Sequence, residues 1–259
     1  MKVNVLATGS KGNATIIQSG ATTLLLDAGI SGKCIVSRLT HPDTFDHIQA
    51  IFITHEHSDH VKFLGTLAKR LNVPIYITKK SLKALAPNIK EYLYDVSINL
   101  IEAKKTYTFG DFDISTFNLM HDSADILGYY FYSTTEHKSI AYAADTGVFP
   151  ESLLPLFKEA EIVMLEANHN VEILNASNRD YYVKQRALSA TGHLNNSQCL
   201  DVLKRINNPQ LKVVILLHKS EECNTVEAIM ADTVNPFKKI FSGDVYIGYQ
   251  NEPTGIIEV

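Results

Sequence analysis

Short blocks of apolar residues alternate with polar turns along most of this chain, and most blocks have the length of a β-strand. Gly, Ser and Asn turn signals separate the first three blocks, which predicts a meander of strands over residues 3–7, 14–18 and 22–26. A strand over 50–54 leads into a polar stretch rich in histidine. Apolar spacing then predicts, in chain order, a helix over 60–71, a strand over 74–78 and a brief helix that Ser81 caps and that runs to residue 86.

The second half of the chain shows a similar mixture of strands and helices. Between residues 107 and 144, alternating apolar positions predict strands over 112–119, 128–133 and 139–143. The remaining elements expected are helices over 150–159, 195–206 and 225–234, strands over 162–166 and 212–217, and a closing hairpin of 245–249 with 255–258.

Two β-rich halves that each carry helices are typical of two sheets packed face to face with helices outside. The expected fold is therefore an α/β (α+β) four-layer αββα sandwich. A chain of 259 residues without a repeat or low-complexity linker is expected to form a single domain over 1–259. A lid or a substrate-contacting insertion is expected only in residues 167–192, which are rich in Asn, Arg and Tyr.

Composition narrows the functional classes. The net charge is only −4, so no global basic field draws the chain to DNA or acidic lipid, and polyanion binding must come from a local patch or a metal. The first residues show no secretory signal, and the longest apolar stretches, such as 213–217, are too short to span a bilayer. Cys34, Cys199 and Cys223 form a poor disulfide framework. We therefore expect a soluble, cytoplasmic protein with reduced thiols and no membrane partner.

Histidine is the informative residue type. Seven of the ten histidines follow short apolar strands, at positions 55, 57, 60, 121, 169, 193 and 218, and three of these stand in the string HEHSDH over residues 55–60. Imidazole and carboxylate are ligands that zinc, manganese and iron favour. In an extended turn His55 and His57 can project to one side, while Asp59 and His60 reach a second position nearby. A single histidine after a strand is more often a satisfied polar residue, but this density of histidine is costly unless a cation offsets it.

The string HEHSDH matches the signature His-x-His-x-Asp-His, and on this motif the chain resembles the metallo-β-lactamase superfamily. The resemblance implies the αββα metallo-β-lactamase sandwich. It also implies that Asp27 braces the histidine loop and that His121 is the third histidine of a first metal. Asp145 would bridge both metals, and His218 would be the last ligand of the second. The expected metal ligands are His55, His57, Asp59, His60, His121, Asp145 and His218.

The residues outside the histidine string allow other interpretations when each is taken alone. Asp145 could be a turn residue before Gly147, and His218 could cap a strand. Their order at strand ends after an intact histidine string favours the metal site. Two divalent ions, zinc or manganese with iron as a further option, would lower the pKa of a shared water, so that a hydroxide attacks phosphorus or carbonyl carbon. Asp59 would also orient that hydroxide.

Two further segments bear on the substrate, namely MLEANH over 164–169 and TGHLNN over 191–196. They resemble the arrangement in tRNA-processing phosphodiesterases of the superfamily. This resemblance implies that Glu166 orients His193, which protonates the leaving oxygen as a general acid. The alternative is that His193 only lies beside a helix N-terminus that Asn195 caps. His169 and Asn195 are further candidates for substrate contact.

Across the whole chain the sequence resembles the bacterial WalJ/YycJ group of metallo-β-lactamase proteins. Besides the histidine string, the resemblance rests on LATGSKGNAT (6–15), DAGISGK (27–33), EANH (166–169), GHLNN (192–196) and HKS (218–220) with Asn224. It implies a cytoplasmic exonuclease that degrades single-stranded DNA from the 5′ end, with links to DNA repair. The pattern departs at one place, because His169 is usually followed by an acidic residue and here by Asn170.

The sequence gives weaker evidence for a nucleic-acid-binding surface than for the metal site. Tyr181 and Tyr182 could stack on bases. Basic residues near them and earlier in the chain are Lys62, Lys69, Arg70, Lys79, Lys80, Lys83, Arg179, Lys184 and Arg186. A solvated surface explains these residues equally well. The loop TGSKGN over 8–13 lacks P-loop spacing and is expected to be a hairpin turn whose tip could line the mouth of the site.

Three functions stay open at this level. The first is a metal-dependent phosphodiesterase that acts as a 5′-to-3′ single-stranded DNA exonuclease, with RNA as the other nucleic-acid substrate. The second is a metallohydrolase of a small ester, thioester or cyclic phosphodiester, because one metal centre serves all these reactions. The third is a non-catalytic metal-binding regulatory protein, which the complete ligand set disfavours. The sequence does not give the oligomeric state.

Overall fold

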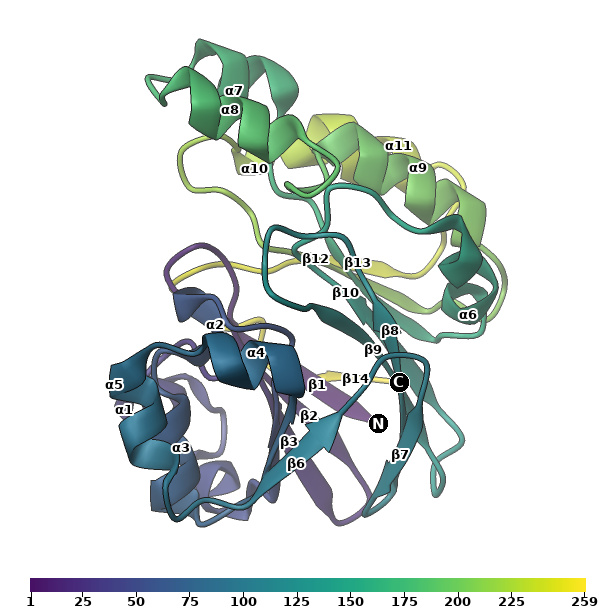
Figure 1. Cartoon of the computed structure of the whole chain (residues 1–259). Helices are drawn as coiled ribbons and strands as arrows, with labels where there is room; N and C mark the ends of the chain where they lie inside the picture. The colour runs from purple at the N-terminus through teal and green to yellow at the C-terminus, as the bar shows by residue number, and fades with distance from the viewer.

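Two seven-stranded sheets face each other in the computed structural model, which describes all residues 1–259, and helices cover the outer face of each sheet (Figure 1). The strand orders are β14-β1-β2-β3-β4-β5-β6 and β13-β12-β11-β10-β9-β8-β7. This arrangement is the αββα sandwich expected from the sequence.

The first sheet starts with the expected antiparallel meander and continues with parallel strands from β3 to β6. Its strands are β1 (Lys2–Ala7), β2 (Ala14–Ser19), β3 (Thr22–Leu26), β4 (Ala50–Phe52), β5 (Ile75–Thr78), β6 (Ile98–Ile101) and β14 (Ile257–Glu258). The helices beside it are α1 (Gly32–Arg38), α2 (Ser58–Val61), α3 (Leu64–Leu71), α4 (Lys79–Ala84) and α5 (Pro87–Lys90), with short 3-10 helices over Pro42–His47 and Glu91–Leu93.

The second sheet is antiparallel from β7 to β10 and parallel from β10 to β13. Its strands are β7 (Thr106–Phe109), β8 (Phe112–Asn118), β9 (Leu127–Ser133), β10 (Ser139–Ala143), β11 (Ile162–Glu166), β12 (Val213–Leu217) and β13 (Asp244–Ile247). Its helices are α6 (Leu154–Lys158), α7 (Val171–Ala176), α8 (Tyr181–Leu188), α9 (Asn196–Ile206), α10 (Val226–Ile229) and α11 (Asn235–Lys238), with a 3-10 turn over Glu151–Leu153 and a π turn over Met230–Val234.

Apolar side chains fill three layers, one between the sheets and one beneath the helices on each side. Aromatic rings dominate part of the middle layer, where Phe52 stacks on Tyr76 with ring centroids 4.3 Å apart and meets Phe131 edge to face. The hydroxyl of Tyr129 donates to the carbonyl oxygen of Ile53, which satisfies a buried polar group in this layer. This packing fixes the two sheets relative to each other, and with them the loops at the sheet edges.

The prediction that residues 245–249 and 255–258 form a closing hairpin is wrong. β13 pairs in parallel with β12 in the second sheet, whereas β14 pairs antiparallel with β1 in the first. The chain therefore crosses from one sheet to the other between these two strands. Local patterning cannot show this, because a short apolar strand fits the edge of either sheet equally well.

Several helices also differ from expectation. The helix expected over 60–71 is two helices, α2 and α3, because the backbone leaves helical geometry at Phe63. Thr78 caps α4, not Ser81, whose buried hydroxyl donates to the carbonyl oxygen of Asp125. The helix expected over 225–234 passes through a π turn into α11, where Pro236 lies in the first turn.

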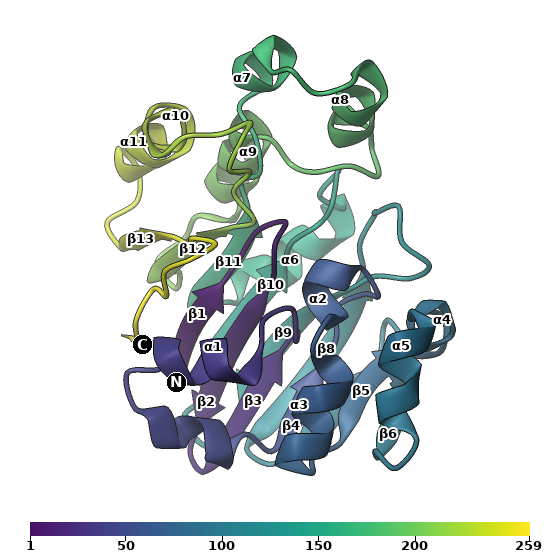
Figure 2. The ribbon, with the colours of Figure 1, turned by 90° about the vertical axis from the view of Figure 1, so that its left-hand side faces the viewer.

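The segment in which a lid or insertion was expected forms α7 and α8, which stand at one end of the molecule beyond α9 (Figure 2). No residue of α8 is buried, which is consistent with its polar sequence. None of the helices is long and apolar enough to cross a membrane. Cys34, Cys199 and Cys223 are free thiols.

Candidate metal centre

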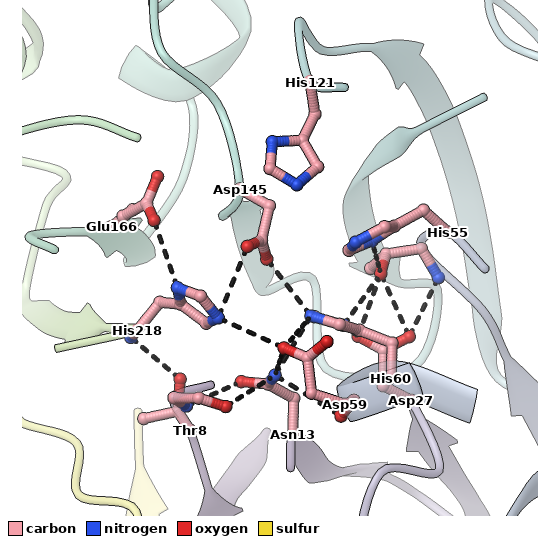
Figure 3. A network of polar contacts seen from close by, with 12 residues as sticks. Thr8, Asn13, Asp27, His55, Asp59, His60, His121, Asp145, Glu166 and His218 are labelled. Atoms are coloured by element: carbon pink, nitrogen blue, oxygen red, sulfur yellow. Dashed lines mark hydrogen bonds and ion pairs between the residues drawn. The ribbon is translucent and has the colours of Figure 1, made fainter. Parts of the chain in front are cut away.

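The seven expected metal ligands come together at one edge of the sandwich, where several strands end. Figure 3 labels all of them except His57. His55 follows β4, His121 follows β8, Asp145 follows β10 and His218 follows β12, while Asp59 and His60 lie on α2. The carboxyl ends of these strands meet at the same edge, so side chains far apart in sequence become neighbours.

His55, His57 and His121 form the first candidate metal position. Each offers a ligand atom within 4.8 Å of the others, and the ring centroids of His57 and His121 are 5.0 Å apart. Nδ1 of His121 lies 3.2 Å from the carbonyl oxygen of Gly192. A carbonyl only accepts, so Nδ1 carries the proton and Nε2 is left as the ligand atom.

Asp59, His60 and His218 form the second candidate position. Asp59 Oδ2 lies 3.3 Å from His60 Nε2 and 3.5 Å from His218 Nε2. Asp145 lies between the two positions, because its carboxylate oxygens are 3.3 Å from both of these nitrogens and it also groups with His55. The Asp145 carboxylate therefore faces both candidate metal positions.

Three residues of this region have left-handed backbone conformations. The φ angles are 62° for Asp27, 57° for Asp145 and 54° for His218. Such a conformation is uncommon for a residue with a side chain and persists where the surrounding structure enforces it, often at functional sites. Here it turns each side chain into the cluster directly after its strand.

Asp27 contacts the histidine loop at Thr54 and His60. Its Oδ2 lies 2.7 Å from His60 Nδ1, which leaves His60 Nε2 facing the cluster. The backbone N–H of Thr54 donates to Asp27 Oδ1, and the Thr54 hydroxyl lies 3.0 Å from His55 Nδ1. Burial raises the pKa of the Asp27 carboxyl, and the charge and hydrogen bond of His60 counteract part of this rise. Two ligand imidazoles thus share one buried support.

The sequence reasoning missed the role of Asn13, which it assigned to a turn. Asn13 Nδ2 lies 3.2 Å from Asp59 Oδ2 and 3.0 Å from His60 Nε2. Its backbone N–H donates to the carbonyl oxygen of Asp59. Gly29 permits this close approach, since a Cβ there would lie 1.7 Å from the same oxygen. Nothing in the turn-like string TGSKGN distinguishes a buttress of the site from an ordinary hairpin.

The cluster fits divalent metal ions. His55 Nε2 is buried and has no hydrogen-bond partner, although buried polar atoms are almost always paired. The surrounding side chains are imidazoles and carboxylates, which form the donor set of zinc, manganese and iron. A metal ion would satisfy this nitrogen and neutralise the gathered carboxylates.

Burial and neighbouring charges shift the pKa values of the histidines in the cluster. Burial lowers the pKa of His55 well below its ordinary value, so this ring is a neutral donor. Burial also disfavours charge on His218, but Asp145, Asp59 and Glu166 outweigh it and raise the pKa of His218 to about 10. His218 therefore holds a proton that a bound cation would displace.

Glu166 and His193 form a pair beside the cluster. Glu166 Oε1 lies 2.7 Å from His193 Nδ1, and its Oε2 accepts from the backbone N–H groups of Thr146 and Leu194. Glu166 is fully buried. Burial raises its pKa, but the charge and hydrogen bond of His193 prevail and hold the pKa below its ordinary value. Asn195 caps α9 in a capping box, which was the other role considered for this segment.

His169 and Asn195 lie outside the cluster. They bridge each other through their backbones and line a small cavity with Asp232 at the start of α9. The His169 ring is buried without a hydrogen-bond partner, and burial lowers its pKa to about 4. Both residues stay candidates for substrate contact at this cavity.

The basic residues near Tyr181 and Tyr182 form hydrogen bonds or ion pairs within the protein. Lys184 Nζ donates to two carbonyl oxygens near the end of α7, and Arg179 and Arg186 each pair with a carboxylate. Tyr181 and Tyr182 are 69% and 83% exposed. The two tyrosine rings are therefore exposed for stacking, whereas the basic side chains beside them have partners within the protein.

Comparison with known proteins gives the family of the chain. The model of the β-lactamase superfamily domain matches residues 22–218. The chain is 36% identical over 241 residues to exodeoxyribonuclease WalJ of Streptococcus pneumoniae, covering 90% of this chain and 87% of the relative. It is 30% identical over 231 residues to exodeoxyribonuclease YycJ of Bacillus anthracis, covering 86% and 84% of the two chains.

Solved structures show the same fold. The metallo-β-lactamase fold protein YhfI of Bacillus subtilis superposes with a TM-score of 0.71 at 20% identity, covering 97% of this chain and 98% of that one. The short form of human tRNase Z gives a TM-score of 0.69 at 16% identity, covering 100% and 98%. The chain is therefore a metal-dependent hydrolase that belongs to the metallo-β-lactamase superfamily, in the group of WalJ and YycJ.

Proposed function

We propose that this protein is a metal-dependent exodeoxyribonuclease that hydrolyses single-stranded DNA from the 5′ end and uses two divalent cations. The observation that carries the proposal is the contact of 2.7 Å between Glu166 and His193 at the edge of the ligand cluster. A phosphodiester releases an alkoxide, which needs a proton, whereas a thiolate does not. The similarity to two named exodeoxyribonucleases supports DNA as the substrate.

The cluster has donors for two cations. His55, His57 and His121 would hold one, and Asp59, His60 and His218 would hold the other, with Asp145 shared between them. When bound, the pair supplies an ionised water near neutral pH and stabilises the charge that develops on phosphate oxygens. Zinc and manganese fit these donors, and iron is a further option.

The chain's own residues position the substrate and move the protons. Asp59 accepts a hydrogen bond from the attacking water and orients it toward phosphorus. As the new P–O bond forms, the bond to the leaving oxygen breaks, and His193 Nε2 gives that oxygen its proton. Glu166 holds the Nδ1–H of His193 and stabilises the charged ring. The products are a free hydroxyl on one side and a phosphate on the other.

Labelled oligonucleotides test the proposal. Single strands of DNA and RNA, labelled at either end, are incubated with the protein and Mn²⁺ or Zn²⁺. We expect DNA to shorten from its 5′ end and RNA to be a poorer substrate. Absence of cleavage with every divalent metal would contradict the proposal, and hydrolysis of a thioester or cyclic phosphodiester instead would favour a small-molecule metallohydrolase.

A further inference from the structure

The carboxylate of Glu166 faces two histidines. Its Oε1 lies 2.7 Å from His193 Nδ1 and 3.3 Å from His218 Nδ1, and Figure 3 draws the contact with His218. The two imidazole rings stack, with centroids 5.2 Å apart and planes 20° apart. One oxygen atom therefore lies beside the same nitrogen of two stacked rings, of which one is a candidate metal ligand and the other is the proposed proton donor.

Backbone contacts fix the orientation of this carboxylate. Its Oε2 accepts hydrogen bonds from the backbone N–H groups of Thr146 and Leu194, at 3.1 Å and 3.2 Å. Glu166 is fully buried at the end of β11. A carboxylate oxygen has two lone-pair sites, so Oε1 can accept from both imidazoles while Oε2 stays with the backbone.

The neighbours of His218 Nδ1 differ in the hydrogen bonds that they can make. Asn168 Nδ2 lies 3.1 Å from this nitrogen and also donates to the carbonyl oxygen of His218, at 2.8 Å. An amide nitrogen only donates, so Asn168 can bond Nδ1 only when Nδ1 carries no proton. The Glu166 carboxylate only accepts, so it can bond only Nδ1–H. The two neighbours therefore favour opposite tautomers of the ring.

The tautomer matters because the other nitrogen of His218 points into the ligand cluster. Nε2 lies 3.3 Å from Asp145 Oδ1 and 3.5 Å from Asp59 Oδ2, in the second candidate metal position. A neutral imidazole binds a cation through the nitrogen that carries no proton. His218 can therefore offer Nε2 to a cation only when Nδ1 keeps its proton, and Glu166 Oε1 is the acceptor beside that proton.

We propose that Glu166 is a positioning residue for His218 as well as for His193, and that it prepares the second metal position by holding the Nδ1–H of His218. The inference rests on the proposed function only in that His218 is a ligand of a cation. Metal-binding histidines usually donate their other N–H to a carboxylate or carbonyl, which fixes the tautomer and the ring orientation. Asp27 is placed to do this for His60. Glu166 gives His218 the same support and shares it with the proton donor.

The variant Glu166→Gln tests the proposal, because the backbone determines how the new amide lies. Its oxygen must take the place of Oε2 to accept from Thr146 and Leu194. Its NH2 group then faces the imidazoles, where the wild type has an acceptor. With this group on one side and Asn168 on the other, His218 Nδ1 meets only donors, so the ring keeps its proton on Nε2 and binds a cation less well.

Two controls separate this effect from others. His193→Ala removes the other partner of Glu166 but leaves the carboxylate beside His218. Glu161→Gln makes the same chemical change just before β11, where Glu161 accepts from Ser139 far from the ligand cluster. Circular dichroism shows whether each variant is folded, and competition with a fluorescent chelator gives the affinity for each Zn²⁺ ion.

We expect the wild type and both controls to bind two ions with similar affinities. Glu166→Gln should bind the first ion normally and the second about 10- to 100-fold more weakly. Excess metal refills the second position, so the loss of affinity is measured separately from any change in kcat.

A measurement on the wild type alone gives a second test that does not depend on the folding of a variant. Long-range ¹H–¹⁵N NMR of the zinc-loaded protein shows which imidazole nitrogen of His218 carries the proton. We expect the proton on Nδ1. A proton on Nε2, or none on Nδ1, would overturn the inference.

Two results of the affinity measurement would also overturn it. In one, folded Glu166→Gln binds both ions as tightly as the wild type. In the other, His193→Ala weakens the second ion as much as Glu166→Gln does, so that the effect passes through His193. Neither result concerns the cleavage of labelled DNA, which tests the proposed function. If the wild type binds two ions as expected but cleaves no DNA, the proposed function fails and the support of His218 stands.

Discussion

Glu166 Oε1 lies 2.7 Å from His193 Nδ1, although the two residues are 27 positions apart in the chain. Two backbone N–H groups fix the other oxygen of Glu166, so its carboxylate cannot rotate away from the imidazole. A buried carboxylate that bonds Nδ1–H sets the tautomer and the orientation of the ring. The pair is therefore arranged as a proton donor with a fixed direction.

Removing this donor should affect DNA cleavage selectively. We expect His193→Ala to lower kcat on DNA by about 10²- to 10⁴-fold, the usual contribution of a general acid. Hydrolysis of a p-nitrophenyl phosphodiester should change much less, since its leaving group needs no proton. Steady-state rates on both substrates, measured at equal metal content, decide the matter, and an equal loss on both would count against the assigned role.

The Glu166→Gln variant separates support from proton donation. Glutamine keeps the shape of the side chain but removes the negative charge beside His193. We expect a smaller loss of kcat than for His193→Ala, because the imidazole remains while its charged partner is lost. A loss as large as that of His193→Ala, or no loss at all, would contradict the supporting role of Glu166.

Asp27→Asn should weaken metal binding without unfolding the protein. The carboxylate orients His60 directly and His55 through Thr54, and loss of such a support usually costs about 10- to 100-fold in metal affinity. Competition with a fluorescent chelator measures the affinity. Asp111→Asn is the control, because Asp111 also accepts several hydrogen bonds but supports the β2–β3 turn. If Asp27→Asn binds metal as tightly as Asp111→Asn does, Asp27 does not support the metal ligands.

Chelation should reduce both activity and stability. A metal that binds the folded state alone stabilises it in proportion to the logarithm of its free concentration. We expect EDTA to abolish hydrolysis and lower Tm, and excess Mn²⁺ or Zn²⁺ to restore both. Elemental analysis gives the stoichiometry, for which two ions per chain are expected. A stoichiometry of one would contradict the dinuclear part of the proposal.

Asn195 offers a test of stability. Its side chain accepts the backbone N–H of Gln198 and caps α9, so Asn195→Ala should lower the free energy of unfolding by about 1 kcal/mol. Urea unfolding measures the change, with exposed Ser197→Ala as control. If Asn195 also contacts DNA, KM rises by more than this modest loss of stability explains.

His169 predicts a pH dependence of stability. Burial lowers its pKa to about 4 in the folded protein, against 6.5 for an ordinary histidine. Between these values the unfolded chain binds a proton that the folded protein excludes, so stability falls as the pH drops through this window. Between about pH 7 and about pH 5, we expect the Tm of the wild type to fall further than the Tm of His169→Gln. Calorimetry at both pH values should show different slopes for the two proteins.

Much of the fold could be predicted because buried strands have a clear local signature. The bounds of β3, β10 and β11 match expectation at both ends, since each is a short run of buried residues between turns. Helix α8 could not be predicted in this way. It buries no residue, so its sequence has no apolar face to reveal it.

The sequence by itself determined the donor set: the string HEHSDH, the acids at strand ends and the pattern that places each after an apolar block. Only the tertiary structure decided which of these atoms meet, that Asn13 contacts Asp59, and that Arg179 and Arg186 tie the segment of α7 and α8 to the loops after β12 and β8. The physical reason is that strand order and left-handed turns, which bring distant strand ends together, arise from packing of two sheets rather than from local propensity.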